Sequence, residues 1–378
     1  MASACAELFG QIGRRAWHRR LSSVRDPGRP THAAGPADRK PGGPLGPARL
    51  AVRATMGDTV RHMDEQAAAR EQLITVADGV ALRVLRWDAA AEPASVAEDA
   101  ATPRSSGDTA AYVLVHGLAS NARLWDGVAR RLAAAGRRSV AVDLRGHGHS
   151  DKPDTGYDFG TIAADLRALI GALGSEFVRP ILVGQSWGAN VVLDTAVRDP
   201  NLVRGIVLVD GGLSDLRDAF PTWEVCWDRL APPPLVGLPL SSVESYFRSA
   251  HADWPEEGFE GSLGNFEIRA DRTIAPWLSR DRHRSILESM YGQRTAELWR
   301  LLRVPALIVP VDGGESDWTK SKRAGTEAAL SAALVTGVPV RVRWFKGDHD
   351  IHAQHPAELT DAILTAERDG LFSGAFPG

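Results

Sequence analysis

The amino-acid sequence predicts an α/β protein whose mostly parallel central sheet is covered by helices on both faces. Short runs of Val, Leu and Ile alternate along the chain with amphipathic stretches of helical length. These runs lack polar residues at alternate positions, as is typical of strands that are buried on both faces. With 378 residues, of which 44% are hydrophobic, the chain can also form a sizeable core.

The first expected element is a hairpin. Between residues 74 and 87, two apolar runs are joined by Asp78 and Gly79, a pair that accepts the positive φ values of a tight turn. Residues 88–109 are rich in Ala, Ser, Pro and acidic residues without periodicity, which predicts a solvated loop. Strands and helices then alternate in a pattern that predicts a parallel sheet, over residues 112–115, 124–135, 139–143, 162–173, 181–183, 189–197 and 205–209.

This alternation stops at residue 212 and resumes near residue 305. Two further strands, 306–311 and 340–345, are expected there, with one helix at 326–333 and another that begins at Pro356. The interval from residue 213 to about residue 300, where the alternation is interrupted, differs in composition. It holds many aromatic residues, among them Trp223, Trp227, Trp254, Trp277 and Trp299. We expect residues 213–300 to form a helical cap, inserted after the sixth strand into a core made of residues 69–212 and 301–378.

Residues 1–68 are expected to form a disordered N-terminal extension. Nine Arg or Lys residues face three acidic residues among the first 50. This composition is also typical of an organelle transit peptide, so a targeting segment stays an alternative. A gene model that begins upstream of a true start at Met56 would give the same bias.

The overall composition excludes several classes of protein. A formal net charge of -3 gives no basic excess for nucleic-acid binding. No apolar run approaches the roughly 18 to 20 residues that span a bilayer. Cys5 and Cys226 are far apart, so neither a disulfide framework nor a cysteine metal site is expected. We therefore expect a cytoplasmic protein with a small-molecule partner and no nucleic-acid or membrane partner; a homo-oligomer stays open.

Four segments place reactive residue types at the ends of predicted strands, where ligands collect in a parallel sheet. In the first, glycines flank Ser186 in the pattern Gly184-x-Ser186-x-Gly188, which indicates a turn too tight for a Cβ on either side. In the second, His349 follows a strand and precedes a proline by seven residues. The other two segments are His116-Gly117-Leu118 and the stretch DLRGHGHSDKP at residues 143–153.

Together these four motifs resemble the α/β-hydrolase superfamily, in the branch with a helical cap after the sixth strand. They occur in the family's order and spacing between about Leu73 and Leu371. The resemblance implies the α/β-hydrolase fold and a hydrolase that needs no cofactor or metal. Ser186 would be the nucleophile and His349 its base, because a serine hydroxyl is a poor nucleophile until an imidazole accepts its proton. The backbone N–H groups of Leu118 and Trp187 would form the oxyanion hole.

The acid of the triad is less clear from the sequence. The family usually supplies it after the seventh strand, where this chain has Gly314. A minority of the family takes it from the end of the sixth strand, where this chain has Asp210. We expect Asp210, with Asp312 as the alternative acid. Glu315 and Asp317 come behind them, because any carboxylate that reaches the imidazole can serve.

These residues predict a serine hydrolase that cleaves a small to medium, mostly apolar ester through an acyl-enzyme. Trp223 and Trp227 are the candidate substrate contacts, because aromatic side chains suit an apolar pocket. C–C bond hydrolysis, lactone opening and cofactor-free perhydrolysis use the same triad and stay open. A non-enzymatic ligand-binding homologue is the alternative of another class, favoured only by Gly314. The resemblance excludes dehalogenases and epoxide hydrolases, whose nucleophile is Asp and not the Ser found at position 186.

The remaining histidines are given structural interpretations. His352 and His355 form an i, i+3, i+6 series with His349, but the residue types around them match no metal-ligand motif, so polar residues at a helix start are expected. His147 and His149 are expected to form a turn rather than to take part in catalysis.

Overall fold

The computed structural model describes residues 69–90 and 110–374. The expected extension at residues 1–68 and most of the expected loop at 88–109 lie outside the described residues, as does Cys5. Within the described part of the chain, no helix is both long and apolar enough to span a membrane.

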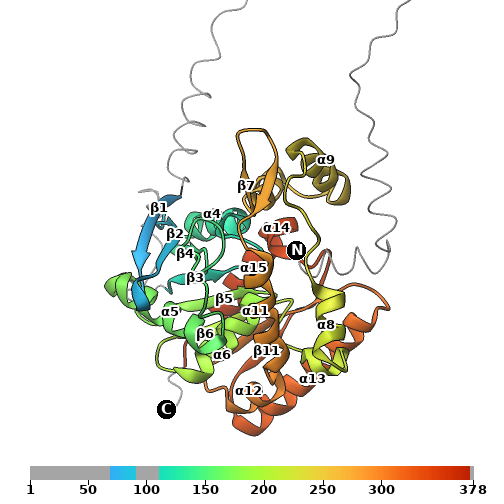
Figure 1. Ribbon diagram of the computed structural model, residues 1–378. Helices are drawn as coiled ribbons and strands as arrows, with labels where there is room; N and C mark the ends of the chain where they lie inside the picture. Colours follow the sequence, from blue (N-terminus) through green and yellow to red (C-terminus); the bar gives the residue numbers. More distant parts are fainter. Residues whose placement is uncertain (1–68, 91–109, 375–378) are drawn as a thin grey trace, which may run out of the picture. The chain divides into compact units, whose positions relative to one another are not determined.

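An eight-stranded sheet lies at the centre of the described chain (Figure 1), in the order β1-β2-β4-β3-β5-β6-β9-β11. Its strands are β1 (Arg70–Thr75), β2 (Ala81–Trp87), β3 (Tyr112–Val115), β4 (Ser139–Val142), β5 (Ile181–Gln185), β6 (Gly205–Val209), β9 (Ala306–Val309) and β11 (Val340–Val342). The pairs β1-β2 and β2-β4 are antiparallel and the other pairs are parallel. The predicted fold class, a mostly parallel sheet, is therefore confirmed.

The hairpin turns where the sequence indicates. Asp78 and Gly79 have φ values of 60° and 75°, within the short 3-10 helix η1 (Ala77–Gly79) that joins β1 to β2. The first strand is edge-exposed, whereas β3, β4, β5, β6 and β9 are buried along their whole length. This burial explains why their sequences are continuous apolar runs.

Alternate residues of each central strand face two separate apolar cores. Val113 and Val115 of β3 pack in the core covered by α5 (Phe159–Ala172), α6 (Trp187–Arg198) and α13 (Asp317–Thr336). Tyr112 and Leu114 pack in the opposite core, covered by α4 (Asp126–Ala134) and α15 (Pro356–Arg368). Helices therefore cover both faces of the sheet, as the period-two alternation of strand side chains requires.

The chain between β6 and β9, here named the inserted segment (residues 213–300), differs from the regular alternation. Its elements are α7 (Leu216–Ala219), α8 (Trp223–Leu230), α9 (Leu240–Ala250), α10 (Glu256–Leu263), β7 (Phe266–Ile268), β8 (Ile274–Pro276), α11 (Arg280–Gly292) and α12 (Thr295–Leu301), which extends one residue beyond it. Part of the segment has a small apolar core of its own, which includes Leu240, Phe247 and Ile274.

Five short elements remain among the described residues. They are η2 (Ala122–Trp125), η3 (Gly174–Phe177), β10 (Val311–Asp312), β12 (Phe345–Lys346) and α14 (Ile351–Gln354). Helix α13 begins nine residues before the expected start at 326, because the Ser316 hydroxyl caps it by accepting a hydrogen bond from Thr319 N–H at 3.1 Å. This earlier start adds Lys322 to the helix.

Candidate active site

Ser186 lies on a sharp turn between β5 and α6. Its backbone is in the left-handed region, with φ 54° and ψ -121°. A Cβ on Gly184 would lie 2.2 Å from Gly188 O, and one on Gly188 would lie 2.4 Å from Val115 O, so neither position accepts a larger residue without opening the turn. The strain is held by surrounding structure, including the 2.9 Å hydrogen bond from Ser186 N–H to Val209 O. The turn therefore presents the Ser186 side chain at the carboxyl edge of the sheet.

The turn after β3 packs directly against this serine. A Cβ on Gly117 would lie only 3.2 Å from Ser186 Cβ, so glycine allows the close approach. Within the described residues, the N–H groups of Leu118 and Trp187 donate no hydrogen bond. Both residues also line the cavity beside Ser186. Two N–H groups near the serine are thus free to bind a developing oxyanion.

His147 holds this turn in place, a role that the sequence interpretation missed. Its Nε2 accepts a hydrogen bond from Ala119 N–H at 3.2 Å, and its Nδ1 lies 3.0 Å from Arg145 O. Its ring also stacks on Trp187, with centroids 5.4 Å apart and planes inclined by 24°. Burial lowers the pKa of His147 well below its ordinary value, so the ring is neutral and Nε2 keeps the lone pair that accepts from Ala119. His149 is exposed and packs against Trp277 instead.

His349 contacts Asp210, which follows the end of β6. His349 Nδ1 lies 2.6 Å from Asp210 Oδ2, and the carboxylate side chain is only 2% exposed. Burial by itself would raise the pKa of Asp210, but the hydrogen bond from His349, the charges of His349 and Lys322 and the N–H of Val311 hold it below its ordinary value. The carboxylate is therefore ionised and can fix the tautomer and the orientation of the imidazole.

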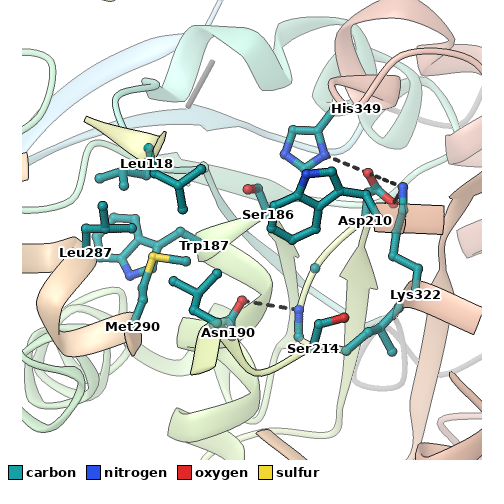
Figure 2. Close-up of a pocket in the computed structure, with 16 residues that line it drawn as sticks. Leu118, Ser186, Trp187, Asn190, Asp210, Ser214, Leu287, Met290, Lys322 and His349 are labelled. Atoms are coloured by element: carbon teal, nitrogen blue, oxygen red, sulfur yellow. Dashed lines mark hydrogen bonds and ion pairs between the residues drawn. The ribbon is translucent and has the colours of Figure 1, made fainter. Parts of the chain in front are cut away.

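His349 lines the same cavity as Ser186. Nε2 is buried and has no hydrogen-bond partner among the described residues. Ser186, His349 and Asp210 all line one cavity, and Figure 2 draws them side by side. No hydrogen bond joins Ser186 Oγ to Nε2 in this structure, a looseness common in sites without substrate.

The other carboxylates considered from the sequence do not contact His349. Asp312 Oδ2 lies 2.9 Å from an Arg323 nitrogen, and Asp312 Oδ1 accepts a hydrogen bond from Gly314 N–H at 2.9 Å. The side chain of Asp317 is fully exposed, and Glu315 is exposed as well. Among the four candidates, Asp210 is the one beside the imidazole.

The cavity has a volume of about 120 Å³ and is mostly apolar. Its apolar wall includes Leu118, Leu213, Leu216, Leu287, Met290 and Trp318, and its polar lining includes Asn190, Ser214 and Lys322 (Figure 2). Trp223 and Trp227, expected from the sequence to contact substrate, are not among the lining residues. They pack against each other with ring centroids 6.0 Å apart, and the Arg284 guanidinium lies over both rings.

The loop that carries His349 is tied to the inserted segment. Asp348 Oδ2 accepts a hydrogen bond from Trp254 Nε1 at 2.8 Å and lies 3.0 Å from His251 Nδ1. The hydrogen bond with His251 lowers the pKa of Asp348 below its ordinary value. On the other side, Gln185 Nε2 donates to His349 O at 3.1 Å. The position of the imidazole thus depends on both the sheet and the inserted segment.

The later histidines have structural contacts. His352 packs against Trp125 with ring centroids 4.5 Å apart, and burial lowers its pKa to about 4. Within the described residues, no group of three or more His, Cys, Asp or Glu side chains is arranged to hold a metal ion.

The fold and the site together define an α/β protein that presents a serine on a strand-to-helix turn at the carboxyl edge of its sheet. A family model described as "Alpha/beta hydrolase family" matches residues 112–362. The chain therefore belongs to the alpha/beta hydrolase family.

Curated relatives match a shorter part of the chain. An uncharacterized protein of Mycobacterium tuberculosis is 38% identical over 109 residues, which are 29% of this chain and 31% of that protein. The 2-(acetamidomethylene)succinate hydrolase of Mesorhizobium japonicum is 38% identical over 107 residues, 28% of this chain and 37% of that protein. A soluble epoxide hydrolase of Corynebacterium sp. is 37% identical over 111 residues, 29% of this chain and 38% of that enzyme. The match spans about a third of the length of these relatives.

Solved structures match a larger part of the chain than the curated relatives do. The crystal structure of E-2-(acetamidomethylene)succinate hydrolase has a TM-score of 0.61 at 22% identity and covers 79% of this chain and 98% of its own. A thioesterase domain from the curacin biosynthetic pathway has a TM-score of 0.59 at 23% identity and covers 79% of this chain and 99% of its own. At these identities the resemblance shows the fold.

Proposed function

We propose that the protein is a serine hydrolase that acts by acyl transfer, with Ser186, His349 and Asp210 as its triad. Ser186 Oγ attacks the substrate carbonyl while His349 Nε2 takes its proton. Leu118 N–H and Trp187 N–H hold the oxyanion of the tetrahedral intermediate. His349 then gives the proton to the leaving alcohol, and in the second half it activates the water that releases the acid.

The observation that carries this proposal is the 2.6 Å contact between His349 Nδ1 and the buried Asp210 carboxylate, beside the cavity that Ser186 lines. The contact supports an enzyme over a non-enzymatic binder, which only Gly314 favours. C–C bond hydrolysis, lactone opening and perhydrolysis by the same triad stay as alternatives. Cytoplasmic location and self-association stay predictions.

The cavity supports a small, uncharged and mostly apolar acyl group. Its volume of about 120 Å³ is close to that of an apolar protein cavity of about 150 Å³ known to accept benzene. A ring or a chain of about four to six carbons would fill such a space. We therefore propose an ester of a short-chain or aromatic acid as substrate.

The inserted segment is proposed to act as a cap over this site. Leu216 of α7, Leu230 of α8, and Leu287 and Met290 of α11 all line the cavity. Because these side chains form one wall of the cavity, changes in the segment should alter which acyl groups fit.

Labelling with a fluorophosphonate probe tests the proposal. We expect the native chain to react at Ser186, Ser186→Ala to lose all reaction, and His349→Ala to react at least about 100-fold more slowly. Ser331→Ala, which changes an exposed serine on α13, serves as the matched control and should react like the native chain. A folded native chain that stays inert would overturn the enzyme proposal.

A panel of p-nitrophenyl esters then tests the substrate class. The proposal expects the highest kcat/KM for acyl groups of about four to six carbons or for benzoate, with a sharp fall for longer chains. A preference for chains of ten or more carbons would contradict the acyl-size proposal while leaving the triad intact.

A further inference from the structure

Lys322 of α13 makes an ion pair with the carboxylate that contacts His349. Its Nζ lies 2.9 Å from Asp210 Oδ1 and 3.2 Å from Asp210 Oδ2, and it donates to Val311 O at 2.6 Å. The three contacts match the three N–H bonds of an ammonium group. Although Lys322 also lines the cavity, its donors are used within the protein, so we do not assign it to the substrate.

The chain around Asp210 is arranged to hold this pair. Val311 N–H donates to Asp210 Oδ1 at 2.8 Å, while Val311 O accepts from Lys322. One carboxylate oxygen thus contacts Val311 and Lys322, and the other contacts Lys322 and His349. The side chain of Lys322 is only 15% exposed, so solvent screens its charge weakly. Figure 2 shows Lys322 and His349 meeting at Asp210.

We infer that Lys322 is a positioning residue that acts through Asp210, and that its charge lowers the pH at which His349 becomes active as a base. The inference rests on the proposed function, because it requires His349 to take a proton from Ser186. A buried carboxylate favours the protonated imidazole, whereas a cation on the same carboxylate offsets that attraction. The inference therefore expects the acid limb of the reaction at Ser186 to lie at lower pH with Lys322 than without it.

Other charged and titratable groups also surround His349. Asp348 and Asp350 flank it in the chain, His352 lies on α14, and His251, which directly follows α9, reaches Asp348. These groups are the same in the native chain and in a Lys322 variant. A difference between the two pH profiles therefore reports the charge of Lys322 and not theirs.

The test compares pH profiles of fluorophosphonate inactivation, with the full chain and no natural substrate. Lys322→Met removes the charge and the donor, Lys322→Gln removes the charge but keeps an N–H donor, and Lys322→Arg keeps the charge. We expect the midpoint of the acid limb to rise by about one pH unit in the Met and Gln variants, and to stay within about 0.3 unit in the Arg variant. Lys320→Met on the same helix, where the lysine is 64% exposed and pairs with Asp317, should leave the midpoint unchanged.

The outcomes separate this inference from the proposed function. A native chain that does not react at Ser186 defeats the proposed function itself. If the native chain reacts and the neutral variants are slower by one constant factor at every pH, with an unmoved midpoint, Lys322 is only structural and the inference is overturned. A midpoint that moves to lower pH overturns it as well. If the Met variant does not fold, the Gln variant carries the same test, because it can still donate to Asp210.

Discussion

Asp210 Oδ2 lies 2.6 Å from His349 Nδ1, although the two residues are 139 positions apart in the chain. Asp210 directly follows β6, and its backbone has a φ of 46°, in the left-handed region that non-glycine residues rarely adopt. Asp312, which lies closer to the usual position of the acid in the family, is bound to Arg323 instead. The carboxylate beside the imidazole thus directly follows β6, the sixth strand along the chain.

Replacing each carboxylate by its amide separates the two candidates. Asp210→Asn should lower kcat by roughly 10⁴-fold, because the amide can hold the imidazole in the wrong tautomer and cannot stabilise its charged form. Asp312→Asn should change kcat less than about threefold, because the Asp312 carboxylate bonds to Arg323 and to Gly314 N–H in its own turn. Ester hydrolysis, measured on variants of equal melting temperature, decides between them. A greater loss in Asp312→Asn would contradict the assignment.

The hydrogen bond from Ala119 N–H to His147 predicts a second catalytic effect. His147→Phe keeps a ring against Trp187 but cannot accept this bond, so the Leu118 N–H loses its fixed direction. We expect kcat to fall by about 10- to 100-fold with little change in KM, somewhat less than the loss of an oxyanion donor. His149→Phe is the matched control in the same turn, because His149 is exposed. Equal kinetics for the two variants would mean that His147 does not support the turn that carries the Leu118 N–H.

The cavity wall predicts a change in chain-length preference. Leu287 is 2% exposed and lines the cavity from α11. Leu287→Ala should move the best p-nitrophenyl ester to a chain longer by about two carbons, at a cost in stability of about 2 to 5 kcal/mol. Leu287→Trp should move it to shorter chains. Leu301→Ala, at a side chain that is 54% exposed, should leave the preference unchanged.

The sequence predicted the fold and the tight turn at Ser186 because both depend on local chemistry. Apolar runs long enough for strands, separated by amphipathic helices, admit few arrangements other than a parallel sheet. Glycine is required at 184 and 188 because an added Cβ would lie 2.2 and 2.4 Å from backbone atoms. The turn can therefore be recognised from its residue types alone. The position of His349 after a strand could likewise be predicted from neighbouring residue types.

The parts that the sequence could not decide depend on distant contacts. Which carboxylate lies beside His349 depends on the fold: Asp312 pairs with Arg323, 11 residues away, whereas Asp210 reaches His349. The support by His147 arises only when its turn folds back onto Ala119. Trp223 and Trp227 were expected in the pocket because the segment is rich in aromatic residues. Composition alone cannot distinguish two tryptophans that pack together under an arginine from tryptophans that line a cavity. Lys322 was missed because Ser316 starts α13 earlier than expected.

Asp126, at the start of α4, predicts a pH dependence of stability. Burial raises its pKa from 3.8 to about 6, although Arg123 and Arg130 partly offset this effect. The folded chain therefore binds a proton that the unfolded chain releases between about pH 4 and 6, so this group makes folding less favourable as pH rises through that window. The effect is at most about 3 kcal/mol.

Urea unfolding of the native chain and of Asp126→Asn from pH 4 to 7.5 measures this contribution. The free energy of unfolding of the native chain, minus that of the variant, should decrease as pH rises and then level off above about pH 6.5. Asp361→Asn, which changes an exposed carboxylate on α15, should give a flat difference. A difference that increases with pH would show that the arginine contacts dominate over burial.

The last prediction concerns the strained turn at Ser186 and compares alanine substitutions at two glycines. A Cβ on Gly184 would lie 2.2 Å from the carbonyl oxygen of Gly188, and a backbone atom cannot yield as the end of a side chain can. Gly184→Ala should therefore cost about 3 kcal/mol and slow fluorophosphonate labelling at least about 100-fold. Gly171 lies near the end of α5, and among the described residues no atom outside its own helix backbone and chain neighbours lies within 4 Å of an added Cβ, so Gly171→Ala should gain about 0.5 to 1 kcal/mol and label normally. Normal labelling of Gly184→Ala would mean that the tight turn is not what makes Ser186 reactive.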